Sequence, residues 1–439
     1  MRHLAWLALA VVACYANALF GDFQFDDYKV IVDNPSVHSW AGWLDNLGRG
    51  IRPLLKLSYT LNWVSGWGVA GFHATNLLIH LGNACLVYAL ADQFLLCQTL
   101  TDGTDRKALA LLTALLFAVH PIHTEAVTYV CGRSTSLMAL LYLGGVLAYA
   151  VGRTRQQKRY LYGLSPALFV AALSVKETAV TFPLALLAWE LACGGSWRGS
   201  LQRQWPSWTV WLGGAVFFLL SDSYLGHMQR STELNSLQGN AATQVLAFAY
   251  LMQQWAMPLW LNIDPDLPLR HSFSGLGLPL LFMAGCLVLM VTFARTRPWI
   301  SFALAWAMLQ LVPLYLFLPR LDVANDRQMY LADWPLHLAL CVELARWTGT
   351  QAFRVTAAAL LLSLGALTVA RNTVYDTETT LWEDTVRKSP DKARVHNNLG
   401  YAYKLANRPD DARREFTVAL QLDPQHIKAR YNLDRLNRP

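Results

Sequence analysis

The sequence predicts an all-α protein with a polytopic membrane domain over residues 1–371 and a short helical-repeat domain over residues 372–439. Of the 439 residues, 54% are hydrophobic and only 15% are charged, whereas about a quarter of the residues of a soluble domain are charged. Apolar stretches long enough to cross a bilayer recur through the first domain, and the second matches a repeat signature. The net charge of +7 lies largely in short loops and gives no indication of nucleic-acid binding.

The apolar stretches predict about eleven membrane crossings. The first stretch, residues 4–20, resembles a signal peptide with an Ala-Asn-Ala cleavage site. We interpret it as a retained first span, because many further spans follow. The other expected spans cover residues 72–96, 108–128, 136–151, 160–175, 178–192, 207–221, 276–293, 299–317, 331–344 and 355–370. A further apolar segment, 242–261, would break the alternation of sides, so it is interpreted as a re-entrant or interfacial helix.

Basic loops assign the two sides of the membrane. Such loops lie at residues 153–159, 198–203, 295–297 and 346–354, and the positive-inside rule places them in the cytoplasm. The loop after the first span and the C-terminal repeats then lie on the outer side. The compact loops and short repeat domain suggest a bacterial chain, in which case the protein is expected in the inner membrane with these parts facing the periplasm.

The C-terminal domain matches the tetratricopeptide signature at most of its positions. Leu399-Gly400 occupy the Leu-Gly positions, and His396 stands where the signature has Trp. The remaining signature positions are filled in order by Tyr403, Ala412, Phe416, Ala419 and Pro424. One repeat with flanking half-repeats cannot bury a continuous core, so the domain is expected to lean on the membrane domain. Two roles stay open: a stabilising cap, or a surface that holds a peptide or partner protein.

Ionisable residues gather in the predicted outer loops. The loop after the first span carries the acidic pair Asp26 and Asp27, which is suited to take a proton from an acceptor but could also be a solvated turn. Ionisable groups at membrane depth generally indicate function. The further candidates in and next to the outer loops are His73, His80, Glu125, Arg133, Lys176, Glu177, Asp326 and Arg327. The cations are suited to hold a phosphate, although each could instead serve packing or ion pairing.

A divalent metal is a possible alternative at one of these loops. His120 and His123, followed by Glu125, are ligand types that metals accept. Their spacing is not a defined zinc signature, and Pro121 makes the geometry uncertain. Metal dependence therefore stays open at this point.

The motifs resemble those of the transmembrane-and-tetratricopeptide-repeat O-mannosyltransferases and their bacterial relatives. They are Phe25-Asp26-Asp27-Tyr28, Arg52-Pro53-Leu54, Phe72-His73-Ala74-Thr75-Asn76, His120-Pro121-Ile122-His123-Thr124-Glu125-Ala126-Val127, Gly132-Arg133-Ser134 and Lys176-Glu177-Thr178-Ala179-Val180. The resemblance covers nearly the whole chain, and the His-Pro-Ile-His-Thr-Glu run is its most specific part. Two departures are visible. Asp326-Arg327 stands where relatives usually read Glu-Arg, and the repeats are far fewer than in animal members.

The resemblance implies a GT-C fold, a polyprenyl-phosphate sugar donor and a Ser or Thr hydroxyl acceptor. It implies that Asp26 or Asp27 is the general base, and that Arg133, Lys176 or Arg327 holds the donor phosphate. We therefore predict an inverting transferase that binds its acceptor protein or peptide through the repeats. No cofactor beyond the sugar donor is firmly implied, and a divalent metal stays possible. Two rival functions stay open: a transferase of the same fold that modifies an envelope glycolipid, and a non-catalytic membrane scaffold.

Overall fold

The computed structural model describes residues 2–47, 51–99, 105–220, 235–312 and 322–436, and these residues form helices and no strands. The all-α prediction is therefore confirmed for this part of the chain. The helices of the first domain are α1 (Arg2–Tyr15), α2 (Trp40–Asn46), α3 (Pro53–Ser65), α4 (Gly68–Leu96), α5 (Arg106–Val119), α6 (Thr124–Val127), α7 (Arg133–Thr154), α8 (Ser165–Leu173), α9 (Phe182–Ala192), α10 (Trp197–Arg203), α11 (Trp205–Leu220), α13 (Leu237–Ala256), α14 (Gly277–Thr292), α15 (Pro298–Leu311), α17 (Met329–Ala332), α18 (Trp334–Trp347) and α19 (Thr350–Asn372).

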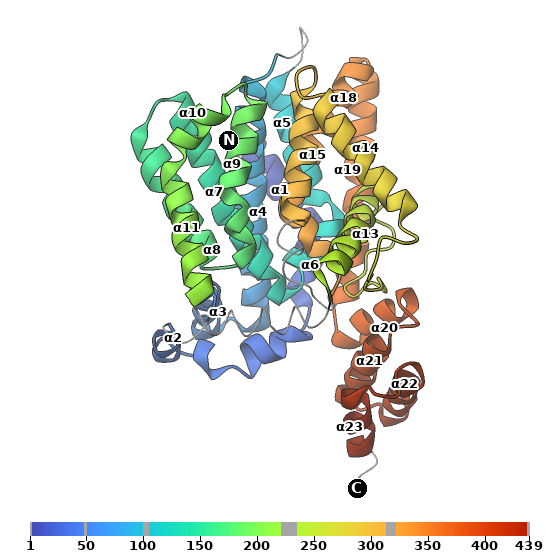
Figure 1. Cartoon of the computed structure of the whole chain (residues 1–439). Helices are drawn as coiled ribbons and strands as arrows, with labels where there is room; N and C mark the ends of the chain where they lie inside the picture. Colours follow the sequence, from blue (N-terminus) through green and yellow to red (C-terminus); the bar gives the residue numbers. More distant parts are fainter. Residues whose placement is uncertain (1, 48–50, 100–104, 221–234, 313–321, 437–439) are drawn as a thin grey trace.

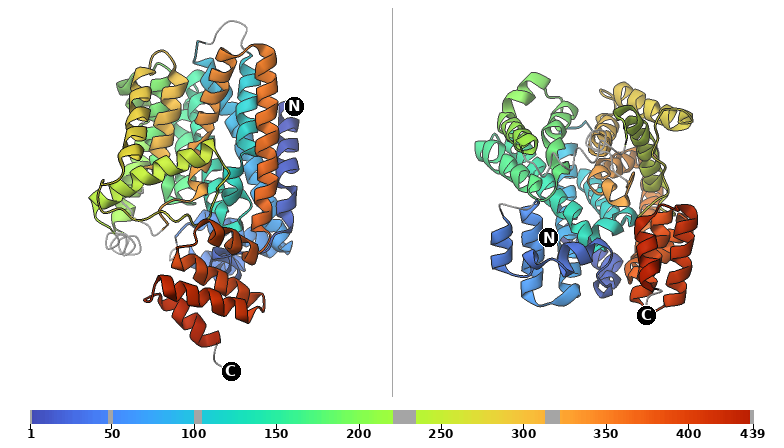
Figure 2. Two further views of the ribbon diagram at one scale, coloured as in Figure 1. Left: turned by 90° about the vertical axis from the view of Figure 1, so that its right-hand side faces the viewer. Right: turned by 60° about the horizontal axis from the view of Figure 1, so that its bottom comes forward.

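The long helices run side by side as a bundle, and the repeat helices project from one of its ends (Figure 1). The basic segments that the sequence assigns to the cytoplasm include α10 and the end of α18, and both lie at the opposite end of the bundle. Helix α13 crosses the long helices obliquely (Figure 2, left). It covers most of the segment interpreted as re-entrant, and it ends just before Pro258.

An aromatic core holds the middle of the bundle together. Trp189 of α9, Phe302 and Trp306 of α15 and Trp334 of α18 are buried and contact one another, with 5.5 Å between the ring centroids of Trp306 and Trp334. Large aromatic side chains bury the most apolar area per residue. The core therefore fixes α9, α15 and α18 relative to one another, and with them the loops at their ends.

The expected eleven crossings are only partly found. Four helices among the described residues are long and apolar enough to span a membrane: Arg2–Phe20, Gly68–Leu96, Val130–Thr154 and Thr350–Tyr375. A fifth span results if α5 and Pro121–Val127, bent by 51° against each other, are counted as one. The segments 160–173, 277–292 and 298–311 form shorter apolar helices. Composition alone could not reveal breaks such as the one at Pro121, which shorten helices below the roughly 20 residues that a span needs.

The C-terminal domain consists of four helices: α20 (Glu378–Lys388), α21 (Ala393–Leu405), α22 (Pro409–Leu422) and α23 (Ile427–Leu436). Helices α21 and α22 pack as a pair around the buried signature residues Leu399 and Phe416. A Cβ atom at Gly400 would lie 2.7 Å from the Phe416 ring, so the signature glycine allows the two helices to approach closely. The repeat therefore folds as the signature predicts.

Several contacts join the repeat domain to the membrane domain. Phe25 packs edge-on against Trp382 of α20, with 5.1 Å between the ring centroids. Asp264, in the segment after α13, accepts hydrogen bonds from Lys392 (2.6 Å) and from Arg394. These contacts place α20 and the start of α21 directly over the outer loops.

Candidate active site

Two small pockets lie at the outer loops, and Arg327 lines both; the first pocket also includes residues of the repeat domain. The first pocket is lined by Phe25, Glu125, Tyr129, Ile263, Asp264, Asp322, Asn325, Arg327, Trp382 and Arg394. The second is lined by Thr135, Met138, Lys176, Thr178, Gln310, Arg327, Gln328 and Leu331. Each spans about 300 Å³ of space between the side chains, and this figure includes open solvent. The structure thus brings residues from seven separate sequence segments close to Arg327.

The two neighbouring aspartates have different surroundings. Asp27 is fully buried, and its carboxylate accepts hydrogen bonds from the backbone N–H of Gln24 (3.0 Å) and of Cys131 (2.8 Å). Burial raises the pKa of Asp27 to about 7. Its two oxygens tie the first loop to the start of α7. Asp27 is therefore held in place by the backbone and is shielded from solvent.

Asp26 is only half-buried, and residues next to it line the first pocket. Its backbone N–H donates to the hydroxyl of the pocket residue Tyr129, with 3.1 Å between the heavy atoms, and the adjacent Phe25 also lines the pocket. Burial raises the pKa of Asp26, and the nearby Arg327 charge opposes this shift. A carboxylate with a raised pKa is a stronger base than an exposed aspartate. Asp26 thus lies beside pocket residues and has enhanced basicity.

Arg327 is held between the pockets by Glu125. The buried Glu125 carboxylate accepts a hydrogen bond from the Arg327 backbone N–H (3.0 Å) and pairs with its guanidinium (3.3 Å). The Arg327 side chain itself is 20% exposed, so part of the guanidinium faces the pockets. Next to this pair, Asp326 is buried, and its pKa is raised to about 8 by burial and by the Glu125 charge. Asp326 is therefore largely protonated near neutral pH.

Lys176 carries the second cation of the site. It is 7% exposed, and its Nζ donates to the Thr135 hydroxyl at 2.7 Å. The adjacent Glu177 points elsewhere and forms a two-pronged ion pair with Arg52, with distances of 3.0 and 2.7 Å. This ion pair joins the loop before α3 to the segment that carries Lys176. It therefore supports the position of Lys176.

Arg133 does not reach either pocket. Its guanidinium is fully buried and donates to the Asn76 side chain (2.7 Å) and to the carbonyls of Ser58 (3.0 Å) and Phe72 (2.9 Å). The arginine thus joins α3, α4 and α7. We therefore assign it to helix packing and not to a phosphate. Sequence reasoning could not foresee this, because its partners come from distant segments.

The two histidines of α4 also serve packing. His73 bonds to the Gly21 carbonyl through Nε2 (3.1 Å). His80 bonds to the Tyr330 hydroxyl (2.7 Å) and to the Ala118 carbonyl (3.1 Å). Both are buried away from the two pockets. Their role in the site is therefore indirect.

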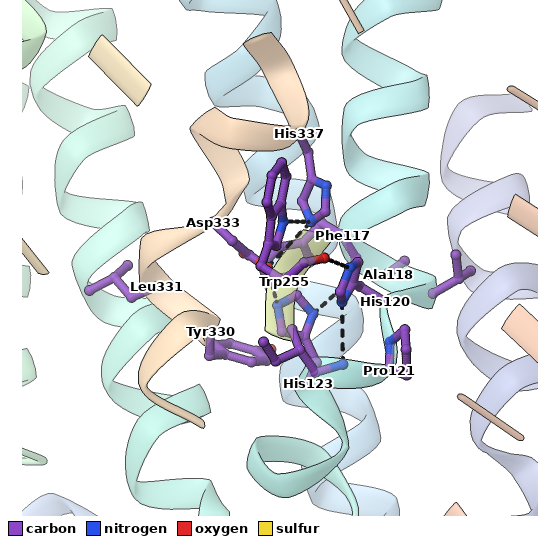
Figure 3. A network of polar contacts seen from close by, with 12 residues as sticks. Phe117, Ala118, His120, Pro121, His123, Trp255, Tyr330, Leu331, Asp333 and His337 are labelled. Carbon is purple, nitrogen blue, oxygen red and sulfur yellow. Dashed lines mark hydrogen bonds and ion pairs between the residues drawn. The ribbon is translucent and has the colours of Figure 1, made fainter. Parts of the chain in front are cut away.

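The proposed metal ligands His120 and His123 belong to a hydrogen-bonded network (Figure 3). His123 bonds to the Phe117 carbonyl (2.8 Å) and to Asp333 (3.0 Å), and His120 donates to the Trp255 carbonyl (3.1 Å). Ring nitrogens engaged in this way offer no lone pair to a metal ion. No three His, Cys, Asp or Glu residues of the described segments are arranged to hold a metal. The residues present thus do not fit the expected metal site.

Several residues of this region were missed from the sequence. Asp333 is fully buried and pairs with His123 and, at 3.3 Å, with His337. Tyr129 and Arg394 line the first pocket. Tyr129 follows the His-Pro-Ile-His-Thr-Glu run closely, so its place in the sequence was a usable signal. No sequence signal indicated Arg394, because it lies in the repeat domain.

An apolar groove opens between α13 and α14. It is lined mainly by apolar side chains, including Leu246, Met252, Leu278 and Phe282, with Tyr250 at its wall. Burial raises the pKa of Tyr250, and the charges of Asp326 and Glu125 raise it further. The charges of these two carboxyl groups therefore reach the wall of the groove.

Comparison with known proteins supports a family relationship. A family model for the tetratricopeptide repeat matches residues 393–426. The chain is 26% identical to the protein O-mannosyl-transferase Tmtc3 of Drosophila melanogaster over 98% of this chain and 56% of that protein. It is 27% identical to human protein O-mannosyl-transferase TMTC1, over 99% of this chain and 56% of that protein. No solved structure matches. The chain spans about half the length of these curated relatives, and the matches confirm the resemblance carried by the motifs.

Proposed function

We propose that this chain, which is related over nearly its whole length to the transmembrane and tetratricopeptide-repeat O-mannosyltransferases, transfers a sugar from a polyprenyl phosphate to a Ser or Thr hydroxyl of an acceptor polypeptide. One observation carries the proposal. Arg327 lines both pockets, its charge acts on Asp26, and Lys176 lines the second pocket with it. We infer that Asp26 supplies the base and that Arg327 and Lys176 supply the cations for the donor phosphate.

The reaction follows from these positions. The acceptor hydroxyl attacks the anomeric carbon, and its proton passes to the Asp26 carboxylate. The bond between the anomeric carbon and the phosphate oxygen breaks on the opposite face, so the configuration inverts. Arg327 and Lys176 stabilise the negative charge that develops on the leaving polyprenyl phosphate. Asp27 holds the loop that carries Asp26 but does not take the proton.

The apolar groove supports a lipid-linked donor. Its wall residue Tyr250 lies near Asp326 and Glu125, so an isoprenoid chain in the groove would have its phosphate close to Arg327. Apolar grooves bind ligands of matching character, and a few polar groups fix the orientation. We further propose that the site and the repeats face the periplasm of a bacterial inner membrane, as the basic loops at the opposite end of the bundle suggest.

Transfer by the purified protein tests this function. The full chain is incubated with a labelled mannosyl polyprenyl phosphate and a Thr-containing peptide, and label in the peptide is measured. The Asp26→Asn variant should lower the rate at least about 100-fold, since a positioned base contributes about that much. Asp22→Asn is the matched control, because Asp22 is an exposed acid of the same loop. Wild-type transfer by Asp26→Asn would exclude Asp26 as the base. Label in a lipid acceptor alone would favour the glycolipid-modifying transferase. Transfer to neither acceptor would favour the non-catalytic membrane scaffold.

A further inference from the structure

Two cysteines from distant parts of the chain lie together at the end of the bundle that carries the basic segments. Cys97 directly follows α4, and Cys193 directly follows α9. The Gln98 side chain donates to the Ala192 carbonyl at 3.1 Å, which joins the ends of the two helices. The Cys97 and Cys193 side chains form a hydrogen bond with each other, and both are free thiols. The two sulfur atoms are therefore direct neighbours.

The packing of α4 against α9 holds this thiol pair in place. Phe94 of α4 and Trp189 of α9 are buried and pack edge-on, with 5.5 Å between the ring centroids. Each ring precedes its cysteine by about one helical turn, so the ring contact and the thiol contact follow the same seam. The seam opens to solvent at the thiols, because Cys97 is exposed and Cys193 is half-buried. Helix packing therefore builds the pair and leaves it accessible to a small reagent.

Charged groups from three helices surround the pair. Arg153 of α7 donates to the Cys193 carbonyl (3.5 Å) and pairs with Glu190 of α9 (3.0 Å). Arg203 of α10 pairs with the other carboxylate oxygen of Glu190 at 2.9 Å. Glu190 is fully buried, so two cations share one carboxylate. The remaining positive charge favours a thiolate next to it.

The two cysteines differ in acidity. The hydrogen bond from Cys193 lowers the pKa of Cys97 to about 6, burial opposes this shift, and the Arg153 charge supports it. The pKa of Cys193 is raised, chiefly by its hydrogen bond with Cys97. When protonated, Cys97 can instead donate to the Gln93 carbonyl (3.7 Å). The thiolate is the nucleophilic form of cysteine. Cys97 is therefore the reactive member of the pair near neutral pH, and Cys193 stays a thiol beside it.

We propose that Cys97 and Cys193 form a reversible redox site, which a hydroperoxide oxidises to an intramolecular disulfide and a dithiol reduces again. The Cys97 sulfur attacks the peroxide, the O–O bond breaks, and a sulfenic acid forms while the leaving oxygen takes up a proton as water. The Cys193 thiol then loses its proton, and its sulfur attacks the Cys97 sulfur. The S–O bond breaks and a second water leaves. The thiols give up two electrons, which the peroxide receives.

The position of the pair sets when it would be oxidised. Arg153 begins the basic segment that the sequence assigns to the cytoplasm, where reducing systems keep thiols open. We therefore expect the pair to be reduced in growing cells and to close during oxidative stress. The disulfide would tie the end of α4 to the end of α9, and α9 begins shortly after the segment that carries Lys176. The inference goes beyond sugar transfer and does not depend on it.

Disulfide mapping in the purified full chain tests the site. The reduced protein is treated with hydrogen peroxide, and its tryptic peptides are analysed by mass spectrometry. We expect a link between Cys97 and Cys193 that dithiothreitol removes. The link should be lost in Cys193→Ala, where Cys97 should instead advance to the sulfinic acid. Cys85→Ala is the matched control, because this second thiol of α4 lies outside the pair, and it should keep the link. Absence of the link, or disulfides only between the Cys97 residues of two copies, would overturn the site.

The pH dependence of alkylation tests the roles of the two thiols. The rate at which iodoacetamide modifies Cys97 is measured against pH, and we expect a midpoint near its pKa of about 6. Cys193→Ala and Arg153→Gln should each raise the midpoint by about one pH unit, a tenfold loss of thiolate when the pH lies well below the pKa. Arg153→Lys keeps the charge and should restore it. Arg198→Gln is the control, because Arg198 is an exposed arginine of α10. A midpoint that neither Cys193→Ala nor Arg153→Gln moves would overturn the assignment of Cys97 as the attacking thiol.

Discussion

At the residue scale, the two neighbouring aspartates differ in what they can do. Asp27 is buried, and both of its oxygens accept backbone hydrogen bonds. A carboxylate held in this way orders a loop. Asp26 is half-buried next to the pocket residue Phe25, and the charge of Arg327 lowers its pKa. Asp27 therefore orders the loop, whereas Asp26 is the candidate base. A substitution of Asp27 should change stability, and a substitution of Asp26 should change the rate of transfer.

The pH dependence of transfer should report Asp26. A general base acts only when deprotonated, so kcat should fall as the pH is lowered through the Asp26 pKa. Because burial raises this pKa, the fall should start at a higher pH than an exposed aspartate would give. Arg327 lowers the pKa, so Arg327→Gln should move the acidic limb to higher pH, and Arg327→Lys should not. A pH profile of kcat for the three proteins checks this. An unmoved limb in Arg327→Gln would contradict the assignment.

At the scale of elements, the segment after α13 connects the two domains. Asp264 is 5% exposed and pairs with Lys392 and Arg394 at the start of α21. The Asn262 side chain donates to the Ser389 hydroxyl at 2.8 Å. This segment thus supplies the partners that so short a repeat domain lacks within itself.

Removal of the Asp264 charge should loosen the repeat domain. Asp264→Asn leaves Lys392 without its carboxylate partner and leaves Arg394 with Asp322 alone, and loss of one member of a buried pair costs up to about 3–5 kcal/mol. We expect faster tryptic cleavage near the junction with α20 and a lower Tm. Asp266→Asn is the control, because Asp266 is exposed and forms no ion pair among the described residues. Equal cleavage of both variants would mean that the apolar contact of Phe25 with Trp382 is enough to hold the repeat domain in place.

At the scale of the whole molecule, the basic segments and the candidate site lie at opposite ends of the helix bundle. The basic segments lie at one end, and the candidate site and repeats lie at the other (Figure 1). In the proposed function, a lipid-linked donor reaches the site within the membrane plane, whereas a polypeptide acceptor arrives from the aqueous side. We therefore propose that the two substrates meet at Arg327 without obstructing each other.

This separation predicts opposite labelling of the two ends in intact cells. In a background without native cysteines, Thr417→Cys on α22 should react with a membrane-impermeant maleimide. Arg155→Cys, at the end of α7, should react only after the cells are permeabilised. Both positions are exposed, so access depends on the side of the membrane. Labelling of Arg155→Cys in intact cells would contradict the predicted orientation.

The sequence by itself determined the features that depend on local patterns. Apolar stretches, basic loops and the repeat signature predicted the membrane domain, the two-sided charge distribution and the helix pair around Phe416, because each is encoded in neighbouring residues. The same patterns brought Asp26, Lys176 and Arg327 into consideration.

Only the tertiary structure decided which of the candidate groups face open space. Arg133, His120 and His123 bond to groups far away in the chain, and a sequence pattern cannot reveal such partners. The distinction between Asp26 and Asp27 likewise depends on the backbone N–H of Cys131. The free energy of a polar side chain is set by its burial and its hydrogen-bond partners, and both arise only when distant segments pack together.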